Sequence, residues 1–141
     1  GIPATVLARA LDAAGPVAEE TSPFDVGFDT VASFTRKRRR NMPLVLLGEE
    51  GVRGVARLQQ ALLASLAASD LVTRAEPSFT PHLTLLYDDI ALPPQATAKA
   101  MSWRVDEMLL VRSHLGQGRH EVLARLPLRG SAKAPARGAS G

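Results

Sequence analysis

The sequence predicts an α+β domain with a largely antiparallel β-sheet and helices packed on one face. Some segments have helical apolar spacing, whereas others are short and alternate apolar with polar residues. Neighbouring strand segments are joined mainly by short turns or loops instead of helices. Such connections favour antiparallel pairs, because parallel neighbours need a crossover of a dozen or more residues.

The first half of the chain predicts a helix followed by a hairpin. Residues 3–14 carry apolar side chains at helical spacing until Gly15-Pro16 ends the pattern. Residues 24–34, FDVGFDTVASF, alternate as a half-buried strand does, and the apolar run 44–47 predicts the partner strand. The basic segment TRKRRRN then lies at or near the tip of this hairpin.

The second half predicts another helix and three further strands. A single apolar stripe runs from Val52 to Leu66, with steps of three and four residues. Residues 82–88 predict a strand, and a proline-containing surface loop follows over 88–100. Two strands over 103–113 and 119–128 are joined by HLGQG, a turn flanked by glycine.

Composition sets the domain limits and excludes some chemistry. Residues 1–128 are predicted to form one domain, and residues 129–141 a disordered tail, because the tail has no large apolar residue. No apolar run approaches the ~20 residues that span a bilayer. The chain has no cysteine, which excludes disulfides and thiolate metal sites and is compatible with a cytoplasmic location.

The positive charge is concentrated in one run. Of 17 basic residues, three lie in the predicted tail, which leaves 14 basic against 14 acidic residues in the domain. Five of these 14 are consecutive, Arg36 to Arg40. The run is either a solvated hairpin tip or a contact for RNA phosphates through Arg36, Arg38 and Arg39.

The segment FTPHLTLLYDD, residues 79–89, holds a candidate catalytic pair. His82 and Thr84 are two apart on a strand and therefore share a face, whereas Leu83, Leu85 and Tyr87 point toward the helices. A hydroxyl can donate to a phosphate oxygen, and an imidazole can move a proton. The spacing alone favours a simpler interpretation, a hydrogen-bonded histidine on a wet sheet face, because the pattern is very short.

The surrounding segments favour the catalytic interpretation of His82 and Thr84 over the simpler one. PLVLLGEEGVRGVARLQQALLASLAAS, then FTPHLTLLYDD, then VDEMLLVRSHLGQGRHEVLARLPL resemble, in this order, the 2H phosphoesterase superfamily. Within it, the chain is most similar to the 2'-5' RNA ligase or RNA 2',3'-cyclic phosphodiesterase family. The resemblance covers nearly all of residues 1–128. It implies a bilobal fold with two His-x-Thr motifs across a cleft, of which residues 82–85, HLTL, are the second.

The resemblance also implies a reaction. His82 would be a general acid or base, and Thr84 would hold a non-bridging phosphate oxygen. The substrate would be RNA that ends in a 2',3'-cyclic phosphate, with 2'-5' RNA ligation as a further activity and with no metal or cofactor. Two other functions remain open: a non-catalytic RNA-binding or interaction domain, and a hydrolase of another small cyclic phosphodiester.

The chain departs from the family pattern because it has no first His-x-Thr motif. Neither His114 nor His120 is followed two places on by Thr or Ser. We expect an upstream segment to supply this motif, since the chain starts at Gly1 without Met; the alternative is loss of catalysis. His120 alternates with apolar residues and is expected to be buried and structural, Tyr87 to be core, and His114 to be exposed.

Overall fold

The computed structural model describes residues 2–72 and 79–131 and contains two compact units. One unit comprises Gly1–Phe24, Leu58–Ala75 and Val105–Gly141. The other comprises Asp25–Arg57 and Glu76–Arg104. The α+β class is confirmed, and the strands form two separate sheets instead of one.

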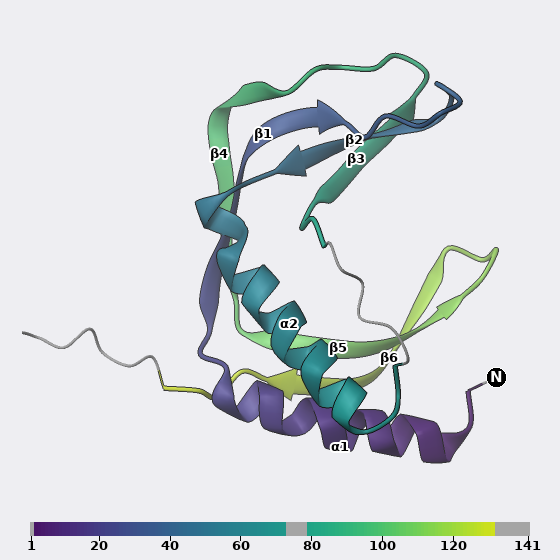
Figure 1. Cartoon of the computed structure of the whole chain (residues 1–141), viewed down its shortest axis with the longest axis vertical. Coiled ribbons are helices and arrows are strands. Elements are labelled where there is room, and N and C mark those ends of the chain that lie inside the picture. Colours follow the sequence, from purple (N-terminus) through teal and green to yellow (C-terminus); the bar gives the residue numbers. More distant parts are fainter. Residues whose placement is uncertain (1, 73–78, 132–141) are drawn as a thin grey trace, which may run out of the picture. The chain divides into compact units, whose positions relative to one another are not determined.

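The second unit contains a four-stranded sheet in the order β3-β2-β1-β4 (Figure 1). Its strands are β1 (Phe24–Ser33), β2 (Met42–Leu47), β3 (Leu83–Asp88) and β4 (Gln95–Val105). The predicted hairpin of β1 and β2 is confirmed as an antiparallel pair, and β3 pairs antiparallel with the other side of β2. The strand that was predicted to carry the candidate site is therefore an edge strand.

The core of this unit lies on β1 and β2. The alternation predicted for β1 is confirmed, because Val26, Phe28 and Ala32 are buried. Met42 and Val45 on β2 are almost completely buried, with 1% and 0% of their surface exposed. These side chains hold β2 in place, and β2 in turn positions β3.

A β-bulge changes the direction of side chains along β3. Thr84 pairs with Val45, whereas Leu86 pairs with Leu44, so Leu85 is an extra residue. Paired residues lie on the same side of a sheet, and adjacent residues lie on opposite sides. Thr84 and Leu86 therefore lie on opposite sides, and the simple alternation that we predicted for this strand holds only up to the bulge.

The first unit contains a hairpin, one whole helix and part of a second helix. Its elements are α1 (Ala4–Glu20), β5 (Glu107–His114), β6 (Arg119–Pro127) and the portion of α2 (Arg53–Ala68) from Leu58 onward; a 3-10 turn, Glu50–Val52, precedes α2. The predicted turn of the hairpin is confirmed. Gly116 and Gly118 adopt positive φ angles of 77° and 59°, which glycine tolerates without a Cβ clash.

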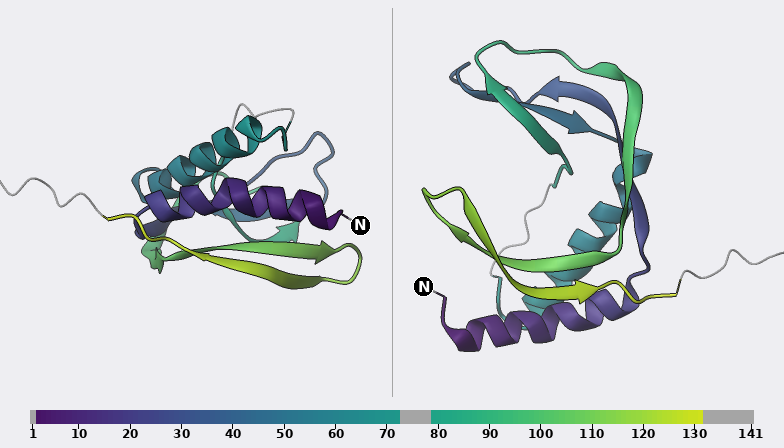
Figure 2. Two further views of the ribbon diagram at one scale, coloured as in Figure 1. Left: turned by 90° about the horizontal axis from the view of Figure 1, so that it is seen from below. Right: turned by 180° about the vertical axis from the view of Figure 1, so that it is seen from behind.

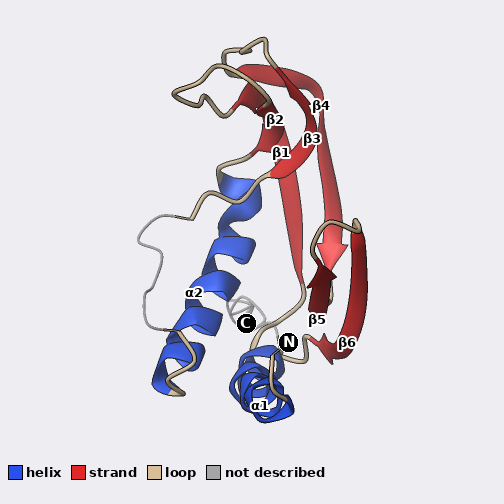
Figure 3. Cartoon of the chain, turned by 90° about the vertical axis from the view of Figure 1, so that its right-hand side faces the viewer, coloured by secondary structure: helices blue, strands red, loops and turns tan. Residues whose placement is uncertain are grey.

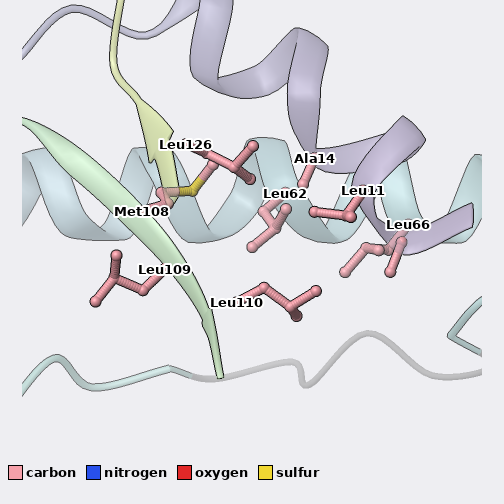
Figure 4. A pocket seen from close by; sticks show the side chains of 9 residues that line it. Leu11, Ala14, Leu62, Leu66, Met108, Leu109, Leu110 and Leu126 are labelled. Carbon is pink, nitrogen blue, oxygen red and sulfur yellow. The ribbon is translucent and has the colours of Figure 1, made fainter. Parts of the chain in front are cut away.

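Both helices lie on one side of the β5–β6 hairpin, as predicted (Figure 3). Leu11 from α1 and Leu62 from α2 face Met108 of β5 across an apolar cavity of about 140 Å³ (Figure 4). Figure 2 shows α1 running along the hairpin, and the chain just after β6 is tied to α1 because the Arg129 N–H donates to the Ala18 carbonyl at 2.9 Å. Apolar contact thus attaches the hairpin to the helices.

Three predictions of element boundaries are wrong. The first helix does not end at Gly15-Pro16 but continues to Glu20, because Val17 and Ala18 are buried and this packing outweighs one lost backbone hydrogen bond at Pro16. The region predicted as a loop over 88–100 includes the start of β4. The predicted strand 103–113 is split at Asp106 between β4 and β5.

The predicted tail is described only in part. Gly130 donates its N–H to the Thr21 carbonyl at 3.0 Å, whereas residues 132–141 lie outside the described residues. Within residues 2–72 and 79–131, no helix is long and apolar enough to cross a membrane.

The burial of Met42 on β2 leads us to a prediction about the stability of the protein. The substitution Met42→Ala should lower the free energy of unfolding by about 2–5 kcal/mol, because it leaves a cavity beside β3. Met101→Ala is the matched control, since Met101 is 51% exposed and its truncation should cost little. Urea denaturation measures both values, and an equal loss in the two variants would contradict this account of the core.

Candidate active site

His82 directly precedes β3 and is held by one backbone hydrogen bond. Its Nδ1 atom lies 2.8 Å from the carbonyl oxygen of Thr80. A carbonyl oxygen can only accept a hydrogen bond, so Nδ1 must carry the proton. In the neutral ring Nε2 is then the free acceptor, and the side chain is exposed to solvent. This arrangement leaves Nε2 able to take a proton from a bound molecule.

Thr84 lies on the same side of the sheet as the buried Val45 of β2 and Ala32 of β1, whereas the buried Met42 lies on the opposite side. Its partner Val45 pairs in turn with Ala32 of β1. His82 lies two residues before Thr84, ahead of the bulge, and therefore shares this side. Both side chains are exposed. The structure thus brings the predicted imidazole and hydroxyl together on one accessible face.

Phe34 is a third member of this face. Its ring centroid lies 4.9 Å from that of His82, and the ring planes meet at 69°, an edge-to-face contact. Phe34 follows β1 and lies two residues after Ala32, which agrees with the side that the register assigns to His82. Its backbone N–H donates to the Pro43 carbonyl at 2.9 Å, so the aromatic ring is carried by an anchored segment.

A shallow hollow of about 250 Å³ lies next to His82 in the same unit. It is lined by Thr30, Leu47, Gly48, Glu49 and Thr80. Thr80 is the residue whose carbonyl holds His82, and Leu47 follows Leu46, the partner of Leu83. The hollow therefore adjoins the segment that holds His82, although the His82 side chain does not line it.

The end of the basic run at Arg40 lies at the far end of β3 from His82. Asn41, directly after Arg40, donates its backbone N–H to Asp89 Oδ1 at 2.7 Å, which ties this end of the run to the turn after β3. The other end begins at Arg36, two residues after Phe34, whose ring contacts His82. The run therefore extends between the His82 side of the unit and the turn after β3.

The basic side chains are available to a ligand. All five residues of the run are exposed. Within the described parts of the chain, none of them forms an ion pair. Asp88 and Asp89 are occupied by backbone N–H groups of the turn and of Asn41, and they serve the loop structure.

The other two histidines belong to the β5–β6 hairpin. The prediction that His120 is buried is wrong: it is exposed and its Nδ1 lies 3.0 Å from Ser113 Oγ on the facing strand. His114 was expected to be exposed but is half-buried, with Nε2 3.3 Å from Glu121 Oε2. Tyr87 was expected in the core and is 56% exposed, because an edge strand leaves it uncovered.

The chemistry available on this face is proton transfer together with hydrogen bonding to an anion. His82 offers Nε2, and Thr84 offers a hydroxyl donor. Among the residues that the structure describes, no group of three His, Asp or Glu side chains is placed to hold a metal ion.

A family model described as the 2'-5' RNA ligase superfamily matches residues 1–117. The chain belongs to this superfamily. The match includes His82 and Thr84 as well as the basic run. A comparison with curated proteins finds no match.

Solved structures agree with this assignment. Escherichia coli LigT complexed with NADP+ is 26% identical over 91% of this chain and 70% of its own, with a TM-score of 0.67. LigT complexed with 3'-AMP gives a TM-score of 0.69 at 24% identity, over 90% of this chain and 71% of that chain. A protein of Thermus thermophilus gives 0.65 at 23% identity, over 94% of this chain and 75% of that chain.

Two residues of the site were not found from the sequence. Phe34 continues the alternation of β1 and immediately precedes the basic segment, which is the only sequence signal for it. Its contact with His82 joins segments 48 residues apart and depends on the order of the strands. Asp89 falls in the loop predicted over 88–100, and its bond to Asn41 needs the same pairing of β2 with β3.

The hydrogen bond of His82 makes a spectroscopic prediction. In the neutral ring, ¹⁵N NMR should show Nδ1 protonated and Nε2 bare, because Thr80 offers only an acceptor. The three histidines give few signals, and His82→Ala identifies the relevant one. His120 is the internal comparison, since its hydroxyl partner can donate or accept. A predominant Nε2–H form of His82 would contradict the geometry.

Proposed function

We propose that the protein hydrolyses RNA ends that carry a 2',3'-cyclic phosphate, by acid–base catalysis that uses His82. The observation that carries the proposal is the exposed pair of His82 and Thr84 on one side of β3 in a chain of this superfamily. E. coli LigT, a protein of this fold, has been solved in complex with 3'-AMP and with phosphate, which supports a phosphate-containing ligand. We expect the reaction to take place in the cytoplasm.

The reaction needs two proton transfers. A base takes a proton from water as the water oxygen bonds to phosphorus, and an acid protonates the ribose oxygen as its bond to phosphorus breaks. His82 performs one of these transfers through Nε2, while the Thr84 hydroxyl donates to a non-bridging oxygen. If the 3' oxygen leaves and a 5'-hydroxyl replaces water, the product is a 2'-5' phosphodiester.

The basic run, Arg36 to Arg40, supplies affinity for the rest of the RNA molecule. All five of its residues are exposed, and in the described part of the chain none of them forms an ion pair. Arg36, Arg38 and Arg39 are thus suited to phosphates of the RNA backbone. Several basic side chains in a row favour an oligonucleotide over a mononucleotide as substrate.

A second candidate function is a non-catalytic RNA-binding domain. It is favoured by one observation: these 141 residues contain a single His-x-Thr motif, so the partner of His82 is not another copy of that motif in this sequence. Salt-dependent RNA binding without any turnover would support this function over catalysis.

Removal of the imidazole tests the enzymatic proposal. His82→Gln should lower kcat/KM for an oligonucleotide 2',3'-cyclic phosphate by about 10²–10⁴-fold, because one proton transfer is lost. Circular dichroism should show an unchanged fold, since the side chain is exposed. Turnover near the wild-type rate would refute the role of His82.

Removal of the Thr84 hydroxyl tests phosphate binding. Thr84→Val keeps the shape of the side chain and should reduce kcat/KM by about 10–100-fold, as expected for a lost hydrogen bond to a charged group. Thr97→Val is the matched control, because the Thr97 hydroxyl bonds only backbone carbonyls on β1 and β4. Equal kinetics of the two variants would show that Thr84 does not hold the phosphate.

The role of the basic run depends on substrate length. Replacing Arg36, Arg38 and Arg39 with Gln should weaken binding of a ten-nucleotide strand and reduce the magnitude of its log–log salt slope by about 2. Binding of a dinucleotide cyclic phosphate should change less, because it has fewer phosphates for the run to contact. Replacing Arg104, Arg125 and Arg129, which form ion pairs, is the control with equal charge change. An equal effect on both substrates would exclude this role.

A further inference from the structure

Within residues 2–72 and 79–131, the His82 ring is held on one edge by a single hydrogen bond. The Thr80 carbonyl holds Nδ1, and this acceptor lies on a segment that directly precedes the strand. One hydrogen bond on an exposed side chain leaves the imidazole free to rotate away toward water, because water can replace the carbonyl. A second contact is therefore needed to keep Nε2 in one direction.

Phe34 provides this second contact. Its ring meets the imidazole edge-to-face at 4.9 Å, a geometry that the aromatic quadrupole favours. The backbone that carries this ring is anchored by hydrogen bonds. The Phe34 N–H bonds Pro43, and the neighbouring Ser33 is bonded to Leu92 through both its backbone N–H and its hydroxyl, at 3.0 and 2.9 Å.

We propose that Phe34 is a positioning residue, which holds the His82 ring so that Nδ1 stays on Thr80 and Nε2 faces the substrate. The consequence for catalysis rests on the proposed function, whereas the effect on the ring does not. Phe34 acts through His82, so its loss should slow the chemical step while substrate binding is kept.

The test combines kinetics with NMR of the His82 ring. Phe34→Leu should reduce kcat by about two- to tenfold with little change in KM, since the edge-to-face contact is lost and apolar volume remains. The His82 ring protons should shift as the neighbouring ring current disappears, and the ¹⁵N signals should move toward a mixture of tautomers. Phe34→Tyr keeps the ring and should restore both kcat and the ring signals.

Phe79→Leu is the matched control. Phe79 lies three residues before His82 and is exposed, but it forms no aromatic pair with it in the described part of the chain. It should leave the ring signals and kcat unchanged. A thermal melt compares the folding of all three variants, and the Tyr variant decides the question if the Leu variant is unstable.

Two results would overturn the proposal. One is a Phe34→Leu protein whose His82 signals equal those of the wild type, even if kcat falls, because Phe34 would then act on the substrate directly. The other is failure of Phe34→Tyr to restore the ring signals. Absence of turnover in the wild type together with the expected NMR shifts would reject the proposed hydrolysis but support the contact.

Discussion

The edge strand β3 is positioned by antiparallel pairing with β2, from Met42–Asp88 at one end to Leu46–Leu83 at the other. β2 is anchored by side chains that are almost fully buried, so the register of β3 is tied to the core of its unit. His82 lies next to the Leu46–Leu83 end of this pairing, and its ring contacts Phe34. At the other end Asp89 accepts the N–H of Asn41, which holds the Arg40 end of the basic run.

An edge strand suits a site of this kind. All six side chains of β3 are exposed, so polar groups such as Thr84 meet no desolvation cost and remain open to a ligand. Exposure also has a disadvantage, since nothing but local contacts orients the imidazole. The hydrogen bond to Thr80 and the ring of Phe34 supply this orientation, one from the preceding segment and one from the far side of β2.

Much of the fold follows from the sequence because local patterns dominate there. The alternation of Val26 and Phe28 and the glycines of the β5–β6 turn each specify their element within a few residues. Patterns that depend on distant partners were not predictable. Burial of Val17 carries α1 past Pro16, and β4 forms from a segment with little alternation because it pairs with β1.

The candidate site likewise has residues that local sequence patterns predict and residues that depend on distant partners. His82 and Thr84 were predictable from a two-residue spacing and the order of surrounding segments, and the register confirms that they share a side. The exposure of Tyr87 and the contact of Phe34 depend on β3 being an edge strand, which no local pattern reports. The bulge at Leu85 likewise arises from pairing with Leu44 and Val45.

The most direct test of the central claim is a crystal structure of the protein with an oligonucleotide that ends in a 2'-phosphate, the expected hydrolysis product. We predict that phosphate oxygens lie within hydrogen-bond distance, about 2.5–3.2 Å, of both Thr84 Oγ1 and His82 Nε2. A terminal phosphate bound elsewhere, with both side chains free, would contradict the account.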